Sequence, residues 1–360
     1  MNAYRAVGVL VGAFAVALTV ALAWFVMQTP GSVFTEEYEH PIPPVATSGQ
    51  PVSITVQKGE SAKDIGAELQ KQGVIRSRRL FEVLVGVTGV QNSLEAGDYE
   101  FDPGLPAIEV VRRIAEGRTA SHEVTIPEGL RVEEVGALLE QAGIVSKQNF
   151  LEALVRGRYG QAFLSQSTAS GLEGFIFPAT YEFNRGTSAQ DVVSTMLQAF
   201  QVNVADKLQL EGQKLTLDEV VTLASIVERE AQVPSERPRI ASVYLNRLRL
   251  GLQLQADPTV QYAVAKSADS VAAYGYWKKE LTVDDLHLDT PYNTYVNPGL
   301  PPGPIANPGF DAIQAVVRPE QTNYLFFVAT GDGSHAFAET LEEHLHNVEK
   351  YRQIQQQSGQ

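Results

Sequence analysis

The chain has 360 residues, and its content of 44% hydrophobic and 19% charged residues is that of a folded protein rather than a disordered one. Its 42 acidic residues outnumber its 28 lysines and arginines, and the formal charge of −14 argues against nucleic acid or anionic lipid headgroups as a main partner. The absence of cysteine excludes disulfides, thiolate metal sites, iron–sulfur clusters and cysteine nucleophiles.

Residues 7–27 form an uncharged apolar segment. At about 1.5 Å per residue, this segment is long enough to cross a hydrocarbon core of about 30 Å. Arg5 precedes it and Glu36 and Glu37 follow it, so we expect residues 1–6 to lie in the cytoplasm. A cleaved signal peptide is the alternative, but the apolar run exceeds the usual ~15 residues and no small-x-small site follows it. The interpretation is a single-pass anchor in the cell (inner) membrane, with the rest of the chain outside the cytoplasm.

Residues 28–50 contain four prolines and are expected to form a linker. After this linker the sequence repeats itself, first at an offset of 70 residues and then at an offset of 82. The periodicity predicts a β-α-α-β-α path over 51–120 and again over 122–200, with 160–178 as an insertion in the second copy. Chance similarity of two ordinary units is the alternative. The matching segments are 54–56 with 124–126, 65–75 with 135–145, 80–85 with 150–155, and 99–111 with 181–193.

The remainder of the chain, from about residue 205, is predicted to be mostly helical. In chain order we expect a helix over 216–230 capped by Thr216, a helix over 234–250, a short helix from 257, a proline-stiffened surface loop over 297–309, a hairpin of 324–329 with 335–337, and a terminal helix with a capping box of Thr340 and Glu343.

Few residue types are left that could carry chemistry. The histidines, among them His287, His335, His344 and His346, show no metal-binding spacing, and we interpret them as capping, core or surface residues. No Gly-x-Ser-x-Gly nucleophile motif is present. We therefore expect no metal and no cofactor, and carboxylates remain as the candidates for catalysis.

Two glutamates border the apolar face of the helix predicted over 216–230. At 100° per residue, Glu228 and Glu230 lie about 80° to either side of the face centred on Val220, Ala224 and Val227. Partial burial there disfavours the charged form and raises the pKa, which suits a general acid near neutral pH. The alternative is that both are solvated residues at a helix end, and periodicity does not choose between the two glutamates.

A series of sequence blocks resembles the endolytic murein transglycosylase family of bacterial envelopes, over roughly residues 50–348. Eight blocks in the same order make the resemblance specific. The blocks include Leu-Glu-Gly-Phe-x-Phe-Pro at 172–178, Leu-Ala-Ser-Ile-Val-Glu-Arg-Glu at 223–230, Ser-Glu-Arg at 235–237, Asn-Arg-Leu at 246–248, Leu-Gln-Ala-Asp-Pro-Thr-Val at 254–260, Tyr-Asn-Thr-Tyr at 292–295, Gly-Leu-Pro-Pro-Gly-Pro-Ile at 299–305 and His-x-Phe at 335–337.

The resemblance implies a membrane-anchored protein with a module similar to the peptidoglycan-binding LysM fold ahead of the catalytic domain. We therefore expect an α+β fold with a single N-terminal transmembrane helix. A LysM-like β-α-α-β module would occupy 51–120, and its second copy would be merged into a mixed α+β catalytic domain over 121–348. Residues 349–360 would form a C-terminal tail.

The resemblance also implies the reaction, which is cleavage of the β-1,4 bond between N-acetylmuramic acid and N-acetylglucosamine in nascent peptidoglycan strands. The catalytic acid of the family falls on Glu228, the first glutamate of the Ile-Val-Glu-Arg-Glu block. Glu228 would protonate the leaving oxygen and then, as a base, take the proton of the muramoyl C6 hydroxyl. The product is a 1,6-anhydro end that terminates elongation, formed by a lyase without a cofactor. Peptidoglycan synthases and the elongation or division machinery are the implied partners.

Seven further residues are candidates for binding the glycan, by stacking on sugars or bonding to hydroxyls. Core packing, loop capping or an ion pair with Arg247 are their alternative roles. The candidates are Glu173, Glu236, Gln255, Tyr262, Tyr292, Asn293 and Tyr295.

The sequence leaves two rival functions open. One is a peptidoglycan hydrolase (muramidase), with Glu228 as acid and Glu230, Glu236 or Asp257 as base. The other is a non-catalytic glycan-binding or division scaffold. For the enzyme, we expect Glu228 to open into a cleft bordered by the insertion after 160 and the loops around 255–260 and 292–305, while Glu230 faces a structural partner.

Overall fold

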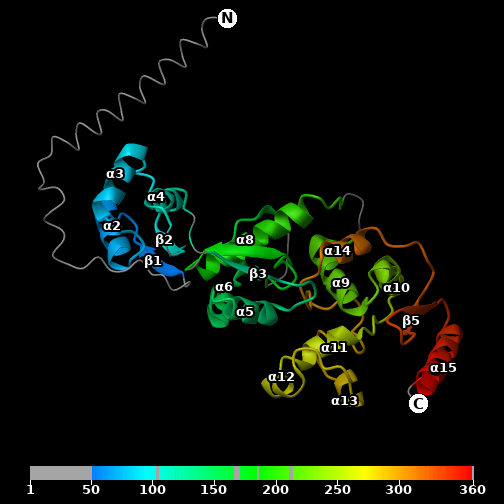
Figure 1. Cartoon of the computed structure of the whole chain (residues 1–360). Coiled ribbons are helices and arrows are strands. Elements are labelled where there is room, and N and C mark those ends of the chain that lie inside the picture. Colours follow the sequence, from blue (N-terminus) through cyan, green and yellow to red (C-terminus); the bar gives the residue numbers. More distant parts are fainter. Residues whose placement is uncertain are drawn as a thin grey trace, which may run out of the picture. The chain divides into compact units, whose positions relative to one another are not determined.

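The computed structural model describes residues 51–102, 105–117, 119, 121–165, 171–184, 186–210 and 214–358 (Figure 1). The chain divides into two compact units, Met1–Thr119 and Ala120–Gln360. The predicted cytoplasmic tip, membrane segment and linker lie outside the described residues. Within the ranges just given, no helix is long and apolar enough to span a membrane.

The first unit is built around a two-stranded antiparallel sheet in which Ile54 lies opposite Tyr99. Both residues are buried, and three helices contribute further apolar side chains, including Ile65, Phe81 and Val111, to the same core. The described elements are β1 (Val52–Val56), α2 (Ala62–Lys71), α3 (Arg78–Thr88), β2 (Gly97–Phe101) and α4 (Ala107–Ala115).

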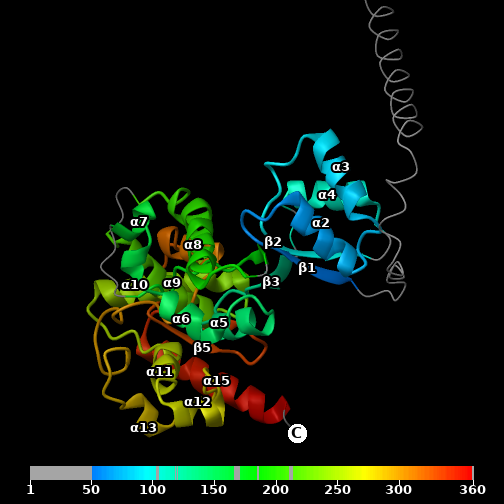
Figure 2. The same ribbon diagram turned by 90° about the vertical axis from the view of Figure 1, so that its left-hand side faces the viewer.

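The second unit begins with the same path around a second antiparallel sheet, in which Val124 lies opposite Tyr181. Its helices α5 and α6 lie side by side (Figure 2). Between α6 and the second strand, the structure adds a short helical stretch and the loop that leads to Pro178, within the predicted insertion. The elements are β3 (Ser121–Thr125), α5 (Val132–Gln141), α6 (Lys147–Ala153), η2 (Arg156–Arg158), α7 (Ala162–Ser165), β4 (Thr180–Asn184), α8 (Ala189–Phe200) and η3 (Gln201–Ala205).

The two copies share local contacts as well as topology. The Tyr99 hydroxyl donates a hydrogen bond to the Glu95 carbonyl, 2.8 Å away, and the Tyr181 hydroxyl donates to the Phe177 carbonyl at 2.5 Å. In each pair the acceptor precedes the tyrosine by four residues. The equivalent hydroxyls therefore bond to equivalent carbonyls.

The structure corrects the alignment of the second helix of the repeat by one residue. Ser77 caps α3 and Ser146 caps α6, each by accepting a hydrogen bond from the amide three residues later. Phe81 and Phe150, both fully buried, then occupy equivalent places, whereas the offset of 70 paired Phe150 with Leu80. The sequence offset failed here because the connection before the helix is one residue shorter in the second copy.

The rest of the second unit adds helices to the same core. Helix α9 packs against α10 and α14 (Figure 1), and every residue from Val220 to Val227 is buried. The core runs without interruption from the second repeat into α14, so the second repeat and the later helices form one body. The elements are α9 (Leu217–Glu230), η4 (Pro234–Glu236), α10 (Arg237–Arg249), α11 (Asp257–Val264), α12 (Ala268–Tyr274), α13 (Val283–Leu286) and α14 (Phe310–Val317), followed by β5 (Phe326–Ala329), β6 (His335–Ala338) and α15 (Leu341–Ser358).

The segment 297–309 is not the surface loop that its prolines suggested, because most of residues 301–309 are buried. Asn307, fully buried, accepts hydrogen bonds from the amides of Gly174 and Ile176 at 2.9 and 3.0 Å and donates to the Leu130 carbonyl at 2.9 Å. A Cβ on Gly174 would lie 2.5 Å from the Pro304 ring, so only glycine fits there. The loop is an internal brace between the second repeat and α9.

The C-terminal region is a hairpin of β5 and β6 on which α15 packs. Thr340 and Glu343 form the expected reciprocal cap, since the Glu343 amide donates to the Thr340 hydroxyl at 3.2 Å and the Thr340 amide to the Glu343 carboxylate at 3.3 Å. The helix continues to Ser358, so the segment expected to be a tail after residue 348 is largely helical.

Candidate active site

Several polar side chains surround a cavity where α9 ends. There a cavity of about 440 Å³ opens between the end of α9, helix α10, the segment before α11, the β5–β6 hairpin and α15. Its walls combine charged, hydroxyl and aromatic side chains. It is lined by Glu230, Val243, Tyr244, Arg247, Leu254, Gln255, Asp257, Tyr295, residues 325–329, His335 and His344.

Glu230, the last residue of α9, is the carboxyl group with the most perturbed environment in this cavity. It is partly buried, and its Oε1 accepts a hydrogen bond from the Tyr244 hydroxyl at 2.8 Å. Burial raises the pKa of Glu230 to about 7, and the negative charge of Asp257 acts in the same direction, against the Tyr244 hydrogen bond and the charge of Arg229. A carboxyl with this pKa is protonated in a large fraction of molecules at neutral pH, as a general acid must be.

Glu228 does not line this cavity, contrary to expectation. Its side chain is 7% exposed, its Oε1 accepts a hydrogen bond from Arg237 Nη2 at 2.8 Å, and its Oε2 accepts one from the Gly309 amide at 3.1 Å. Gly309 precedes α14, so the carboxylate ties the end of α9 to the starts of α10 and α14. The expected geometry is not found: Glu228 is bound by Arg237 and Gly309, whereas Glu230, which accepts from Tyr244, lines the cavity. No described residue of the insertion over 160–178 lines this cavity, although the segment around 255–257 and Tyr295 do.

Two of the seven predicted binding residues, Gln255 and Tyr295, line the cavity. Gln255 has φ 52°, the only positive φ among the described non-glycine residues, and its Oε1 accepts from Arg247 Nη2 at 2.5 Å. Such strain is concentrated at functional sites. The Tyr295 hydroxyl donates to Asp257 Oδ1 at 2.5 Å, and burial raises the pKa of Tyr295.

A third predicted residue, Glu236, reaches the cavity only through a neighbour. Its Oε1 accepts from the His335 backbone amide at 3.1 Å, and its Oε2 lies 2.8 Å from His335 Nδ1. Glu236 is buried, while the His335 ring borders the cavity.

Glu173, Tyr262, Tyr292 and Asn293 are not among the residues that line the cavity. Glu173 accepts from the Val132 amide at 3.0 Å and from Asn307 Nδ2 at 3.1 Å, and burial raises its pKa to about 8. Tyr262 and Tyr292 pack together with ring centroids 4.8 Å apart. Asn293 is fully buried and donates to the Leu286 and Leu288 carbonyls. These contacts are those of packing and capping residues, the alternative role that the sequence left open.

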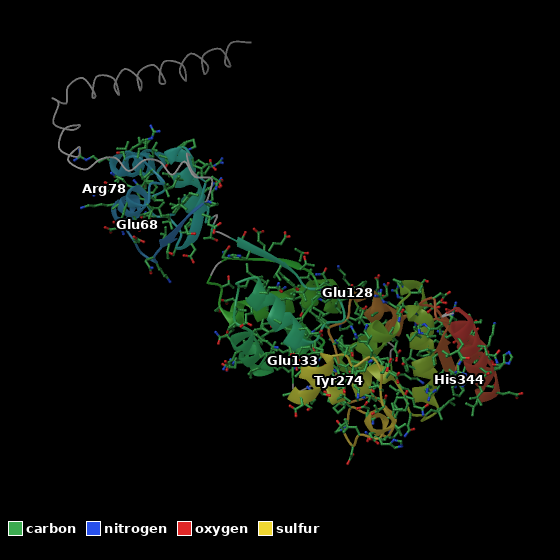
Figure 3. All side chains as sticks on the ribbon, turned by 60° about the horizontal axis from the view of Figure 1, so that its bottom comes forward. Glu68, Arg78, Glu128, Glu133, Tyr274 and His344 are labelled. Atoms are coloured by element: carbon green, nitrogen blue, oxygen red, sulfur yellow. The ribbon has the colours of Figure 1, made fainter. Side chains whose placement is uncertain are left out.

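The cavity also contains residues that sequence reasoning did not select for the site. Tyr244 sits one helical turn before Arg247 on α10, and this spacing was the available signal for a shared face. His344 lies on α15 (Figure 3), where its ring stacks on Phe326 with centroids 5.1 Å apart. His335 and His344 are far from α9 in sequence, so only the tertiary fold brings them to Glu230. Asp257 was considered only as a base for the rival hydrolase.

Within the described ranges, no group of three or more histidine, aspartate or glutamate side chains has the geometry to hold a metal ion.

Comparisons with known proteins place these features in a family context. The YceG-like family matches residues 54–350. A Bacillus subtilis (strain 168) protein named endolytic murein transglycosylase is 33% identical, over 83% of this chain and 84% of the relative. A protein of the same name from Streptococcus pneumoniae serotype 2 (strain D39 / NCTC 7466) is 28% identical over 95% of this chain, which spans 65% of that longer relative. The 2.6 Å crystal structure of a putative yceG-like protein from Listeria monocytogenes superposes with a TM-score of 0.54 at 33% identity, covering 82% of this chain and 98% of that one.

Proposed function

Because the chain belongs to the YceG-like family, we propose that it is an endolytic murein transglycosylase, a lyase that cleaves the glycan strands of peptidoglycan, and that the cavity around Glu230 is its active site. The observation that carries the site assignment is the Glu230 carboxyl, which lines the cavity and whose pKa burial raises to about 7. The relatives that bear the enzyme's name support the reaction.

In the proposed reaction, protonated Glu230 donates its proton to the glycosidic oxygen between N-acetylmuramic acid and N-acetylglucosamine. The bond from C1 of the muramoyl sugar to this oxygen breaks, and positive charge develops at C1. The Glu230 carboxylate then accepts the proton of the muramoyl C6 hydroxyl while the C6 oxygen bonds to C1. Glu230 is protonated again at the end, no water is consumed, and the glycan carries a 1,6-anhydro end.

Glu230 replaces Glu228 in the role of acid because the two carboxylates have different surroundings. Glu228 accepts hydrogen bonds from Arg237 and the Gly309 amide, so each of its carboxylate oxygens is already bound to a donor of the protein. Glu230 has one hydroxyl donor and a carboxylate neighbour, and its pKa is raised.

Asp257 supports hydrolysis as a second candidate reaction, since it lines the same cavity as Glu230. In a muramidase, Asp257 would act as the second carboxylate. Digestion of purified sacculi followed by mass analysis separates the two, because hydrolysis adds one water to the product and the lyase reaction does not. Anhydro products that disappear in Glu230→Gln support the proposal. Hydrated products would replace it with a muramidase, and an intact sacculus would favour a non-catalytic scaffold.

We also propose that residues 7–27 anchor the protein in the cell membrane, with the catalytic unit outside the cytoplasm. The uncharged run and the charge asymmetry around it support this location. Cleavage of strands as they are synthesised would place the protein beside peptidoglycan synthases of the elongation or division machinery. N-terminal sequencing of the mature protein tests the anchor, since a start near residue 30 would mean a cleaved signal.

The first unit is proposed to be a LysM-like glycan-binding module. Its β-α-α-β arrangement around the pair of β1 and β2 supports this assignment. Binding of purified sacculi by a chain that carries Glu230→Gln, with and without residues 51–119, tests whether this unit contributes affinity.

A further inference from the structure

The Glu236–His335 pair at the cavity has no role in the proposed reaction. Glu236 belongs to η4, and His335 is the first residue of β6. Both side chains are largely buried, at 12% and 8% exposure. Burying a carboxylate beside an imidazole is costly unless the pair is well bonded, so its presence at the cavity calls for an explanation.

Glu236 holds His335 by two hydrogen bonds, one to its backbone amide and one to its ring. Its Oε1 accepts from the His335 backbone amide at 3.1 Å, and its Oε2 accepts from Nδ1 at 2.8 Å. A carboxylate is only an acceptor, so Nδ1 must carry the hydrogen of the second bond. Phe327 packs against the ring edge-on, with centroids 5.2 Å apart. The ring is therefore held in one orientation, with Nε2 as its free polar atom.

His335 Nε2 is available to a ligand in the cavity. The ring lines the cavity together with Glu230. In the described part of the chain, Nε2 has no hydrogen-bond partner, yet it is absent from the fully buried polar atoms that lack one. The atom is thus not fully buried, and the ring that carries it lines the cavity. The same use of a carboxylate to orient an imidazole occurs at metal sites and catalytic triads.

We propose that His335 binds the glycan through a hydrogen bond between Nε2 and a sugar hydroxyl, and that Glu236 is the positioning residue for this contact. A hydroxyl both donates and accepts, so it can pair with the imidazole in either charge state. This inference rests on the proposed function, since it takes the ligand of the cavity to be a glycan.

Two substitutions of His335 distinguish the roles of its two ring nitrogens. The asparagine amide reaches only as far as Nδ1, so His335→Asn keeps a donor for Glu236 and removes the group at Nε2. The glutamine amide reaches the position of Nε2, so His335→Gln keeps a polar group toward the cavity and loses the bond to Glu236. The expected losses are therefore opposite: His335→Asn loses binding and keeps stability, while His335→Gln keeps more binding and loses stability.

Binding is measured in a full-length chain that carries Glu230→Gln, with purified uncrosslinked peptidoglycan strands as the probe. We expect His335→Asn to raise Kd about tenfold, the effect of one hydrogen bond, with the melting temperature nearly unchanged. Unchanged affinity in His335→Asn, or weaker binding in His335→Gln than in His335→Asn, would overturn the proposal.

Glu236→Gln tests the positioning role. The glutamine side chain has a single carbonyl oxygen, which cannot accept hydrogen bonds from both the backbone amide and Nδ1 of His335. The ring then loses its orientation, and we expect the affinity for glycan strands to fall. In the His335→Asn background, where Nε2 is already gone, the same change should weaken binding little further. A full additional loss would mean that Glu236 acts on the fold and not through Nε2.

Turnover of sacculi by chains with native Glu230 keeps this inference separate from the proposed function. If the unsubstituted chain releases no product while binding depends on His335, the proposed function fails and the glycan contact stands. If Glu230→Gln abolishes turnover while His335→Asn changes neither Kd nor kcat/KM, the contact alone is wrong.

Discussion

Glu228 and Glu230 are two residues apart at the end of α9, and helix geometry turns their side chains about 160° away from each other around the axis. This rotation explains why one carboxylate meets Arg237 and Gly309 while the other meets the cavity. Both residues lie at the same angle from the apolar face of the helix, so the local sequence does not distinguish them. Their different roles come from the partners that α10, α14 and the hairpin supply.

Glu230→Gln is expected to reduce turnover by about 10²–10⁴-fold, because the amide keeps the size of the side chain but is not a proton donor of useful acidity. The matched control is Glu228→Gln. It should keep most of the turnover and lower the free energy of unfolding by about 1–3 kcal/mol, since one of the two donors to Glu228 loses its acceptor. Release of anhydro-muropeptides and thermal unfolding measure the two effects. Robust turnover in Glu230→Gln with loss in Glu228→Gln would restore the assignment made from the sequence.

The pKa of Glu230 predicts the pH dependence of turnover. Only the protonated carboxyl can act as the acid, and burial raises its pKa to about 7. The rate of bond cleavage should therefore decline as pH rises through about 7, approaching a tenfold loss per pH unit above it. Initial rates of product release between about pH 5 and pH 9 provide the test. Glu228→Gln should show the same alkaline limb, and a rate that stays constant up to pH 9 would contradict the assignment of Glu230 as the acid.

The same pKa makes a prediction about stability. An unfolded glutamate has a pKa near 4.5, and folding raises that of Glu230 to about 7. Below both pKa values the carboxyl is protonated in the folded and the unfolded state, so its ionisation does not lower the free energy of unfolding. Between them the folded state binds more protons than the unfolded state, so the free energy of unfolding falls as pH rises, and the full cost is present above about 7.

Glu230→Gln removes this cost because the amide does not ionise. The variant should melt a few degrees above the unsubstituted chain at about pH 8, given about 2–4 °C per kcal/mol for a domain of this size, and close to it at about pH 4. Calorimetry at the two pH values measures the difference. An equal shift at both values would show that the effect is not due to ionisation.

At the scale of elements, the buried segment 301–309 holds the second repeat against α9. The Asn307 side chain forms hydrogen bonds with two backbone amides and one backbone carbonyl, all more than a hundred residues before it in the chain. Ser225 Oγ accepts from the Ile305 amide at 3.0 Å. A buried loop without a helix or a sheet needs such side chains to satisfy its backbone. The prolines of this segment stiffen the chain, and its polar side chains make burial possible.

Asn307→Ala should lower the free energy of unfolding by at least about 3 kcal/mol, because each buried amide left without an acceptor costs about 1–3 kcal/mol. Asn184→Ala, at an exposed position at the end of β4, is the control and should change stability by about 0.5 kcal/mol or less. Denaturant unfolding of both variants measures the difference. Equal effects of the two substitutions would mean that the loop does not brace the core.

At the scale of the whole molecule, the two units have separate hydrophobic cores with no residue in common. Phe81 and Phe150 are equivalent residues of the repeat, each fully buried in its own core. The two copies therefore offer a matched pair of substitutions in one chain.

Phe81→Ala and Phe150→Ala should each cost about 3–5 kcal/mol in the unit that carries the substitution. Phe81→Ala is expected to lower the midpoint temperature of one calorimetric transition and to leave the turnover of short soluble glycans unchanged. Phe150→Ala should lower the other transition and reduce turnover at elevated temperature, since its core is continuous with α9. A single transition that both variants lower equally would show that the units unfold together.

The sequence by itself determined the elements, since capping residues, periodicity and β-branched runs act over a few residues. The helix over 217–230, the reciprocal cap of Thr340 and Glu343, the hairpin and the β-α-α-β-α path of both copies follow from such local rules. It also identified the transglycosylase family and narrowed the acid to two carboxylates. Gln255 and Tyr295, two of the residues predicted to bind the glycan, line the cavity, and their role in binding stays a prediction.

Only the tertiary structure decided which glutamate faces the cavity, why residues 301–309 are buried, and that Tyr244, His335 and His344 line the cavity. These outcomes depend on contacts between segments far apart in the chain, as between Glu236 and His335, 99 residues apart, or Leu130 and Asn307, 177 residues apart. A local pattern gives the direction of a side chain relative to its own helix. The pKa and the role of that side chain depend on the charge, hydrogen bonds and solvent that the rest of the fold places around it.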